Sequence, residues 1–328
     1  MVKSIQTHYL PRRAYLSFFE CPDAKGKIFM YQRGQPPLCL NIQKAGREGN
    51  LYCFSDNDGN FHTEIEALLE RVESLAHPIL SRLNVADADF ELTLQEWGRV
   101  CEFIAAQIVR TPSWLETSRK MYGESSRAVL MQIARNDQAW QSFISRKPAM
   151  SSEVTADELR RFALSGEYDI DWSGGPYFLG LALKMVEPIT YGLLGRDPIL
   201  LRSSAHDFIT SDHPVVALRH PKSPPLWGKG IINSNFLFPI GASAALDLKV
   251  PLDRNPDAER NTIRVKVRRV GENRTKVINS LTIKNAERFL FANLALKTTA
   301  RQFDSTEQPR RFRVESPPRF PFVMLRNL

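Results

Sequence analysis

Three helix-start motifs constrain the fold of this sequence more than any other feature. Each places a Glu three residues after a Thr, at Thr63–Glu66, Thr93–Glu96 and Thr155–Glu158. In such a capping box the Thr hydroxyl accepts a free backbone N–H of the first helical turn, and the Glu side chain reaches back to the Thr N–H. Apolar residues with a 3.6-residue period follow the first box, which predicts a helix with one buried face. We therefore expect residues 63–150 to be helical, with another short helix after Thr155.

Strand-like segments lie on both sides of these helices. Lys27–Arg33 and Leu38–Ile42 flank a Gly-Gln-Pro-Pro turn, and Leu51–Phe54 ends at an Asp-Asn-Asp-Gly turn, which predicts a small antiparallel meander. In the C-terminal part, residues 207–218, 235–250 and 262–270 are strand-like, and residues 176–194 and 273–296 are helical. The sequence predicts an α+β fold with an N-terminal β-meander, a central helical bundle, and C-terminal antiparallel strands with a closing helix.

Membrane and disulfide signals are missing from the sequence. It has no run of about 18 apolar residues that could span a membrane, and its first 16 residues lack the apolar run of a signal peptide. The four cysteines show no CxxC spacing, which favours reduced thiols in the cytoplasm, with a reactive thiol as the alternative. Without an internal repeat or a linker, we expect one domain over residues 1–301 and a basic, Pro- and Arg-rich tail over residues 302–328.

The positive charge of the chain is concentrated near its C-terminus. Residues 1–253 contain 27 Lys and Arg against 29 Asp and Glu, a balance of −2, whereas residues 254–328 contain 17 against 7, a balance of +10. Such asymmetry indicates a polyanionic partner and carries no information about the fold. DNA or RNA is the partner that we expect.

One predicted strand carries part of this charge on a single face. In residues 262–270, Arg264, Lys266 and Arg268 alternate with apolar residues, so their side chains project from the same side. These cations could follow the phosphates of a nucleic acid. Alternatively, they could protect an edge strand from aggregation.

The segment Thr210–Pro214 is the strongest candidate for a functional site. Ser211, Asp212 and His213 follow an apolar stretch and precede a proline corner, a position from which a fold can present an acid to a cleft. The alternative is a turn in which Asp212 caps backbone amides.

Three further polar residues stand in unusual surroundings. His8 lies in an apolar segment, where it could be a general base, a metal ligand or a histidine hydrogen-bonded in the core. Glu73 could share a divalent cation with Glu66 and Glu70 on one helical face, or these glutamates could cap the helix and face water. Arg110 could hold a phosphate, or it could neutralise the dipole at the end of its helix.

Several of these segments resemble, in order and spacing, the domain of unknown function 4238 family. The matching segments are His8-Tyr9-Leu10-Pro11 with Tyr15-Leu16 and Phe18-Phe19, Lys27–Tyr31, the helix of Glu66 and Glu73, Ala106–Pro112, Phe208–Pro214, Phe238-Pro239-Ile240, and Asn279 with Ala286–Ala292. The resemblance covers about residues 8–295 and brings no known activity with it. Two positions depart from the family pattern: Thr7 replaces the first residue of a His-His pair, and His213 replaces Asn in an Asp-Asn-Pro turn.

We interpret the chain as a nucleic-acid-directed protein, and the leading hypothesis is a metal-assisted nuclease of bacterial defence that uses Mg²⁺ or Mn²⁺. In this hypothesis Asp212, Glu73 and His8 are catalytic, and Asp212 and Glu73 hold the metal. The residues assigned to phosphate or substrate binding are Arg110, Ser211, His213, Arg264, Lys266 and Arg268. Two alternatives stay open: a non-catalytic nucleic-acid-binding module, and a buried polar network of His8, Arg110 and Asp212 that only fixes the fold. The sequence contains no Walker A, GxGxxG, HExxH or GxSxG motif.

Overall fold

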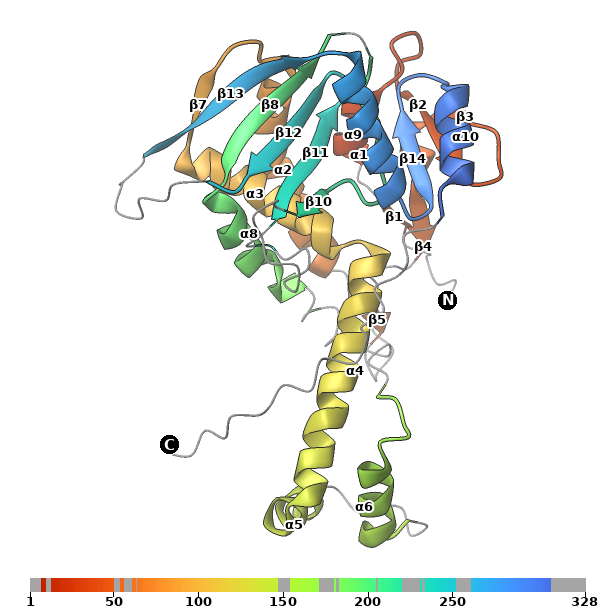
Figure 1. The fold of residues 1–328 in the computed structure, drawn as a ribbon, viewed down its shortest axis with the longest axis vertical. Coiled ribbons are helices and arrows are strands. Elements are labelled where there is room, and N and C mark those ends of the chain that lie inside the picture. The colour runs from red at the N-terminus through yellow and green to blue at the C-terminus, as the bar shows by residue number, and fades with distance from the viewer. Residues whose placement is uncertain are drawn as a thin grey trace. The chain divides into compact units, whose positions relative to one another are not determined.

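Figure 1 shows a computed structural model of the chain. It describes residues 7–9, 13–49, 54–55, 61–62, 64–146, 154–170, 180, 183–204, 206–219, 231, 234–251 and 261–307, with side chains for all of these except 7–9, 47–49, 54–55, 61–62 and 64–66. The chain divides into two compact units. Unit 1 comprises Met1–Pro112 and Leu179–Arg310, and unit 2 comprises Ser113–Phe178 and Arg311–Leu328.

Unit 1 contains a six-stranded mixed sheet with the order β10-β11-β12-β8-β13-β7. Its strands are β7 (Phe90–Thr93), β8 (Asp197–Ser203), β10 (Val216–Arg219), β11 (Ser234–Gly241), β12 (Ala244–Lys249) and β13 (Thr262–Val270). β13 pairs with β7 in antiparallel orientation through its first half and with β8 in parallel orientation through its second half. All other neighbours in this sheet are antiparallel.

A second, four-stranded sheet in unit 1 has the order β3-β2-β14-β9. Its strands are β2 (Lys27–Gln32), β3 (Leu38–Asn41), β9 (Thr210–Ser211) and β14 (Phe289–Ala292). Two short antiparallel pairs accompany it, β1 (Thr7–Tyr9) with β4 (Arg47–Gly49) and β5 (Phe54–Ser55) with β6 (Phe61–His62). Because β14 lies between β2 and β9, this sheet joins the two sequence segments of unit 1.

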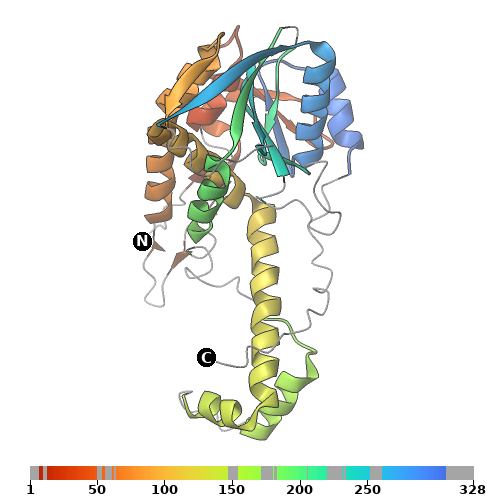
Figure 2. The same cartoon turned by 60° about the vertical axis from the view of Figure 1, so that its left-hand side comes forward.

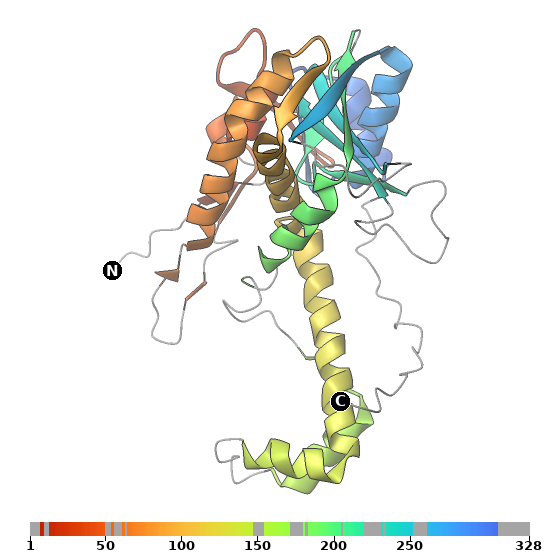
Figure 3. The same ribbon diagram turned by 90° about the vertical axis from the view of Figure 1, so that its left-hand side faces the viewer.

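Helices cover both faces of the six-stranded sheet, as Figure 3 shows with the orange and brown helices α2 and α3 on one side and the blue α9 on the other. The helices of unit 1 are α1 (Arg13–Leu16), α2 (Glu64–Val85), α3 (Leu94–Val109), α8 (Val186–Leu194), α9 (Glu272–Asn285) and α10 (Lys297–Ser305), with the 3₁₀ turns η1 (Ser17–Phe19) and η2 (Ile42–Lys44). Within α3, Trp97, Val100 and Ile104 are fully buried. Each such apolar side chain contributes about 1.5–3 kcal/mol to folding. None of the described helices is long and apolar enough to cross a membrane.

Unit 2 is formed by α4 (Pro112–Arg135), α5 (Asp137–Ser145) and α6 (Ala156–Ser165). Figure 2 shows α5 and α6 beside the C-terminal end of the long α4. Its small core contains Ala134, Trp140 and Ala163, one from each helix. α6 ends at Gly166, whose φ of 67° lies in the left-handed region that glycine adopts without strain.

The structure confirms the α+β class and two of the three capping boxes. Thr93 and Thr155 cap α3 and α6, and each exchanges hydrogen bonds with the Glu three residues later. The side chains of the third box, and most of the third predicted strand of the meander, lie outside the described residues.

Several element bounds differ from the sequence prediction. The predicted closing helix ends at Asn285, and Phe289–Ala292 form the strand β14. α10 continues past residue 302, where the basic tail was predicted to begin. Phe303 in the last turn of α10 is buried against β14. The sequence pattern did not predict the strands β7 and β8. β8 pairs with β13 in parallel orientation, within a sheet that was expected to be antiparallel. The proposed division into residues 1–301 and 302–328 stays a prediction.

Candidate functional site

Asp212 lies directly after β9, and its side chain is 2% exposed. Its carboxylate accepts three backbone N–H groups, from Glu287 (2.9 Å), Arg288 (2.8 Å) and Phe289 (3.2 Å). Its own N–H donates to the carbonyl of Phe289 (3.1 Å). Asp212 therefore fastens the connection between α9 and β14 to the end of β9, and the amides that it caps are about 75 residues away in the sequence.

The surroundings of Asp212 change its acidity. Burial and the nearby charge of Glu287 raise its pKa, the three amide hydrogen bonds lower it, and the net result is a pKa of about 7. Arg33 lies close enough for its charge to interact with Asp212, although burial lowers the pKa of this guanidinium. The carboxylate is thus held by fixed backbone dipoles in an environment that opposes its ionisation.

Ser211 and His213 complete the turn after β9. The Ser211 hydroxyl accepts the backbone N–H of His213 (3.1 Å), which is a local turn contact. The His213 ring is 3.7 Å from a carboxylate oxygen of Glu287. Burial lowers the pKa of His213, and the Glu287 charge opposes this effect. Ser211 is therefore fully buried, whereas the His213 side chain is half-buried at 23% exposure.

Two asparagines of α9 hold the same segment, and neither was predicted to have a role. Asn279 donates to the carbonyl of Asp207 (2.9 Å) and accepts the N–H of Ile209 (3.1 Å). Asn285 donates to the carbonyls of His213 (2.8 Å) and Val215 (3.2 Å). The sequence offers only one hint of these contacts, two side-chain amides in a predicted helix. Their hydrogen-bond partners lie some 70 residues earlier in the chain, so no local pattern identifies them.

Arg110 is connected to this segment through Tyr15 of α1. The Tyr15 hydroxyl donates to the carbonyl of Pro239 (2.5 Å) and lies 2.6 Å from the Thr210 hydroxyl. Burial raises the pKa of Tyr15, and the Thr210 hydrogen bond and the charge of Arg110 oppose this shift. Arg110 itself is the buried C-cap residue of α3. The structure therefore places Arg110 and Thr210 around one buried tyrosine.

Glu73 lies in a different place, in the wall of a cavity of about 730 Å³ between α1, η2 and α2. The cavity is also lined by the carboxylates of Glu20 and Glu70 and by Arg13 and Lys25. Asp212 is not among its lining residues. Of His8 only the backbone is described: β1 pairs with β4, and His8 lies opposite Glu48. A shared site for His8, Glu73 and Asp212 therefore stays a prediction.

The basic residues of β13 lie on the face of the six-stranded sheet that α9 partly covers. Arg268 is opposite Leu201, which packs against Ile278 of α9, and residues opposite one another point to the same face. Lys266 and Arg268 are exposed. In Figure 1 no described helix crosses in front of β8 and β13 on this side. We call this surface the basic face and define it by Lys249, Arg264, Lys266, Arg268 and Arg274.

Acidic residues neutralise part of the basic face. Arg264 pairs with Asp89 (3.0 Å), and Asp247 accepts from Lys249 (2.9 Å) and lies 3.8 Å from Arg274. Within the part of the chain that the structure describes, Lys266 and Arg268 form no ion pair. Lys266 and Arg268 lie in the half of β13 that pairs only with β8, so the alternative explanation, in which these charges protect an edge strand, stays open.

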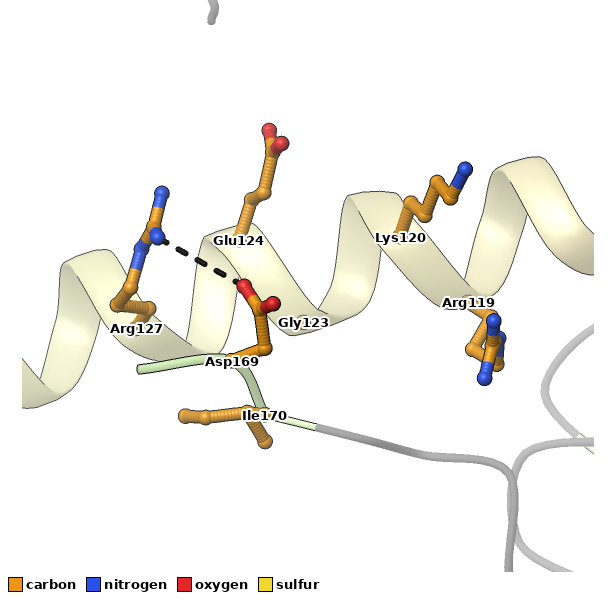
Figure 4. A pocket seen from close by; sticks show the side chains of 7 residues that line it. All are labelled: Arg119, Lys120, Gly123, Glu124, Arg127, Asp169 and Ile170. Carbon is orange, nitrogen blue, oxygen red and sulfur yellow. Dashed lines mark ion pairs between the residues drawn. The ribbon is translucent and has the colours of Figure 1, made fainter. Parts of the chain in front are cut away.

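Unit 2 has a smaller cavity of about 390 Å³, shown in Figure 4. It lies along α4, where Arg119, Lys120 and Arg127 alternate with Glu124, and Asp169 faces Arg127 at 3.9 Å. Arg119 and Lys120 are already paired with Glu116. This cavity is therefore largely charge-balanced.

The residues that the structure describes contain no group of three or more His, Cys, Asp and Glu side chains arranged to hold a metal ion. The Mg²⁺ or Mn²⁺ site of the nuclease hypothesis stays a prediction.

Comparison with curated proteins found no match, and neither did comparison with solved structures. A family model described as protein of unknown function DUF4238 matches residues 6–295, a range that contains both sheets and all the candidate residues named above. The chain therefore belongs to the DUF4238 family.

Proposed function

We propose that this protein binds nucleic acid through the basic face. The observation that carries the proposal is the pair of exposed cations Lys266 and Arg268, which project from one sheet face without an ion pair among the described side chains. Arg264 and Arg274 flank them at 66% and 50% side-chain exposure. Cations at alternate positions of a strand are spaced by about 6.6 Å, close to the separation of successive phosphates in an extended strand.

The composition of the basic face favours a contact with the nucleic-acid backbone over base reading. Its five defining residues are all Lys or Arg, with no aromatic side chain for base stacking. Phosphate contacts position a protein on nucleic acid and do not read its sequence. We therefore expect binding to DNA and RNA with little sequence preference.

Fluorescence anisotropy with labelled DNA and RNA oligonucleotides at increasing KCl tests this proposal. Lys266→Gln/Arg268→Gln should lower the affinity and reduce the slope of log K against log[salt] by about two, since each lost phosphate contact reduces it by about one. Lys297→Gln/Arg301→Gln removes the same charge from exposed positions of α10 and is the matched control. Equal affinities of the two double variants, or wild-type binding that is insensitive to salt, contradict the proposal.

The catalytic form of the proposal is a Mg²⁺- or Mn²⁺-dependent nuclease in bacterial defence, with His8, Glu73 and Asp212 as its catalytic residues. The burial of Asp212 and its three amide contacts favour a structural role for this residue. Incubation of DNA and RNA with the protein and each metal ion decides between a nuclease and a non-catalytic nucleic-acid-binding module. Cleavage that Glu73→Gln abolishes supports the nuclease. Binding without cleavage supports the non-catalytic module. The free thiols of Cys21, Cys39 and Cys101 support the expected cytoplasmic location.

A further inference from the structure

Asp89, in the loop between α2 and β7, holds one cation of the basic face. The ladder between β7 and β13 stops at the pair Phe90–Val265, and beyond this pair none of the described strands pairs with β13 on the β7 side. One carboxylate oxygen of Asp89 accepts the N–H of Val267 there (2.8 Å), and the other lies 3.0 Å from the guanidinium of Arg264. The carboxylate thus bridges a backbone amide and an arginine.

These two donors form an anion-binding position that an exposed acid occupies. A backbone N–H and a guanidinium are groups that bind phosphate oxygens in complexes with nucleic acid. The hydrogen bond from Val267 and the charges of Arg264 and Lys266 lower the pKa of Asp89, so its carboxylate is ionised at neutral pH. The side chains of Asp89 and Arg264 are 39% and 66% exposed. Because exposed ion pairs are weak, an anion from solvent can replace this carboxylate.

We propose, on the basis of the nucleic-acid binding proposed above, that the Val267 N–H and the Arg264 guanidinium form a phosphate subsite of the basic face. Asp89 fills this subsite in the free protein and gives it up to a phosphate of the bound nucleic acid. Arg264, Lys266 and Arg268 stand at alternate positions of β13, so the subsite adds one phosphate contact to the row. Asp89 therefore limits the affinity of the protein for nucleic acid.

Asp87 provides a matched control in the same loop. It pairs with Arg269 (2.7 Å) as Asp89 pairs with Arg264, and both acids are exposed. Arg269 and Arg268 are adjacent in β13, so their side chains point to opposite faces of the sheet. Neutralising Asp87 therefore changes the net charge as much as neutralising Asp89 does, but it frees a cation away from the basic face.

Asp89→Asn tests the proposal in the anisotropy assay. The Asn side chain can still accept the N–H of Val267 through its amide oxygen, so β13 keeps its edge contact while Arg264 loses its ionic partner. We expect the affinity for DNA and RNA to rise about two- to fivefold at 0.1 M KCl, as one exposed ion pair no longer has to be broken. Asp87→Asn should change the affinity by less than about 1.5-fold, because salt screens charges that lie on the far face.

Arg264→Gln gives a second test that does not require a change at Asp89. It should lower the affinity and reduce the slope of log K against log[salt] by about one, because the bound phosphate uses this arginine. In the double variant Arg264→Gln/Asp89→Asn, the gain from Asp89→Asn should disappear, since the two side chains act as a pair.

Three outcomes overturn the subsite: Asp89→Asn binds like the wild type, Asp87→Asn gains as much as Asp89→Asn, or Arg264→Gln leaves affinity and slope unchanged. If one of these occurs while Lys266→Gln/Arg268→Gln still weakens binding, the nucleic-acid interface stands and only the role of Asp89 is wrong. If neither the wild type nor Asp89→Asn binds DNA or RNA at low salt, both proposals are wrong.

Discussion

At the residue scale, the carboxylate of Asp212 connects three parts of unit 1. It follows β9, it accepts the amides that lead from α9 into β14, and it lies within the electrostatic reach of Arg33 beside β2. A buried amide without an acceptor costs about 1–3 kcal/mol. Loss of this side chain thus affects several elements at once, whatever the function of the protein.

We expect Asp212→Ala to lower the free energy of unfolding by about 3 kcal/mol, because three partly buried N–H groups lose their acceptor. Chemical denaturation followed by circular dichroism measures the effect. Asp23→Asn, in an exposed loop, is the control and should change stability by less than about 0.5 kcal/mol. If the denaturation midpoint of Asp212→Ala equals that of the wild type, the three backbone amides have found other acceptors, and the prediction is wrong.

The raised pKa of Asp212 predicts a pH dependence whose sign can be derived. The folded-state pKa of about 7 exceeds the unfolded value, so the folded protein binds the proton more tightly between about pH 4 and pH 7. This contribution to stability is complete below about pH 4 and is lost as the pH rises towards 7. The stability of the wild type relative to Asp212→Asn should therefore fall across this range, by up to about 1.4 kcal/mol per pH unit. His213, whose pKa is lowered, acts in the opposite sense but is present in both proteins. Denaturation curves at several pH values measure the difference, and a pH-independent difference contradicts the prediction.

The residue scale also shows how far the sequence can predict a site. Thr210–Pro214 could be singled out because short polar residues follow an apolar stretch. This pattern led to two interpretations of Asp212, as an acid presented to a cleft and as a cap of backbone amides. The amides of Glu287, Arg288 and Phe289 could not be predicted, since a capping contact across about 75 residues leaves no periodic or local pattern. The same holds for Tyr15, which meets Thr210 from the other end of the chain.

At the element scale, local signals predicted the helix starts better than the strands. A capping box is complete within four residues. Thr93 and Thr155 therefore specify the N-termini of α3 and α6 independently of the rest of the fold. β14 is the opposite case. Its residues continue a helical sequence, and they become a strand because β2 and β9 supply hydrogen-bond partners on both sides. Such partners are set by the tertiary fold and are invisible in a window of sequence.

Gly123 of α4 provides an element-scale prediction. A Cβ at this position would lie 2.5 Å from the carbonyl oxygen of Ile170, so the segment after α6 can pack here only against a glycine. Ala is the better helix former by about 1 kcal/mol, yet Gly123→Ala should speed hydrogen exchange in residues 166–170 because the backbone there must move away. Ser126→Ala on the same helix is the control. Unchanged exchange in Gly123→Ala would show that the segment adjusts at no cost.

At the scale of the whole molecule, unit 1 is built from two separate stretches of sequence. β7 from the first stretch pairs with β13 from the second, and β2 pairs with β14 in the same way. Unit 2 combines residues 113–178, inserted between them, with residues 311–328, and the inserted part has its own small core around Trp140. Sequence patterns detect neither feature, since a discontinuous unit shows no composition change or linker at its borders. The separate cores nevertheless have a measurable consequence.

Each unit should respond to damage in its own core and not in the other. Trp97 is fully buried in α3 of unit 1 and donates to the carbonyl of Leu194 (3.1 Å), whereas Trp140 is buried among the helices of unit 2. Replacing either with Ala should cost about 3–5 kcal/mol within its unit, because a large cavity is left behind. In hydrogen-exchange mass spectrometry, Trp140→Ala should therefore accelerate exchange in α4–α6 and leave β11 and β12 protected, and Trp97→Ala should do the reverse. If either variant loosens both units equally, the two cores form one cooperative structure, and the chain behaves as the single domain that its sequence predicts.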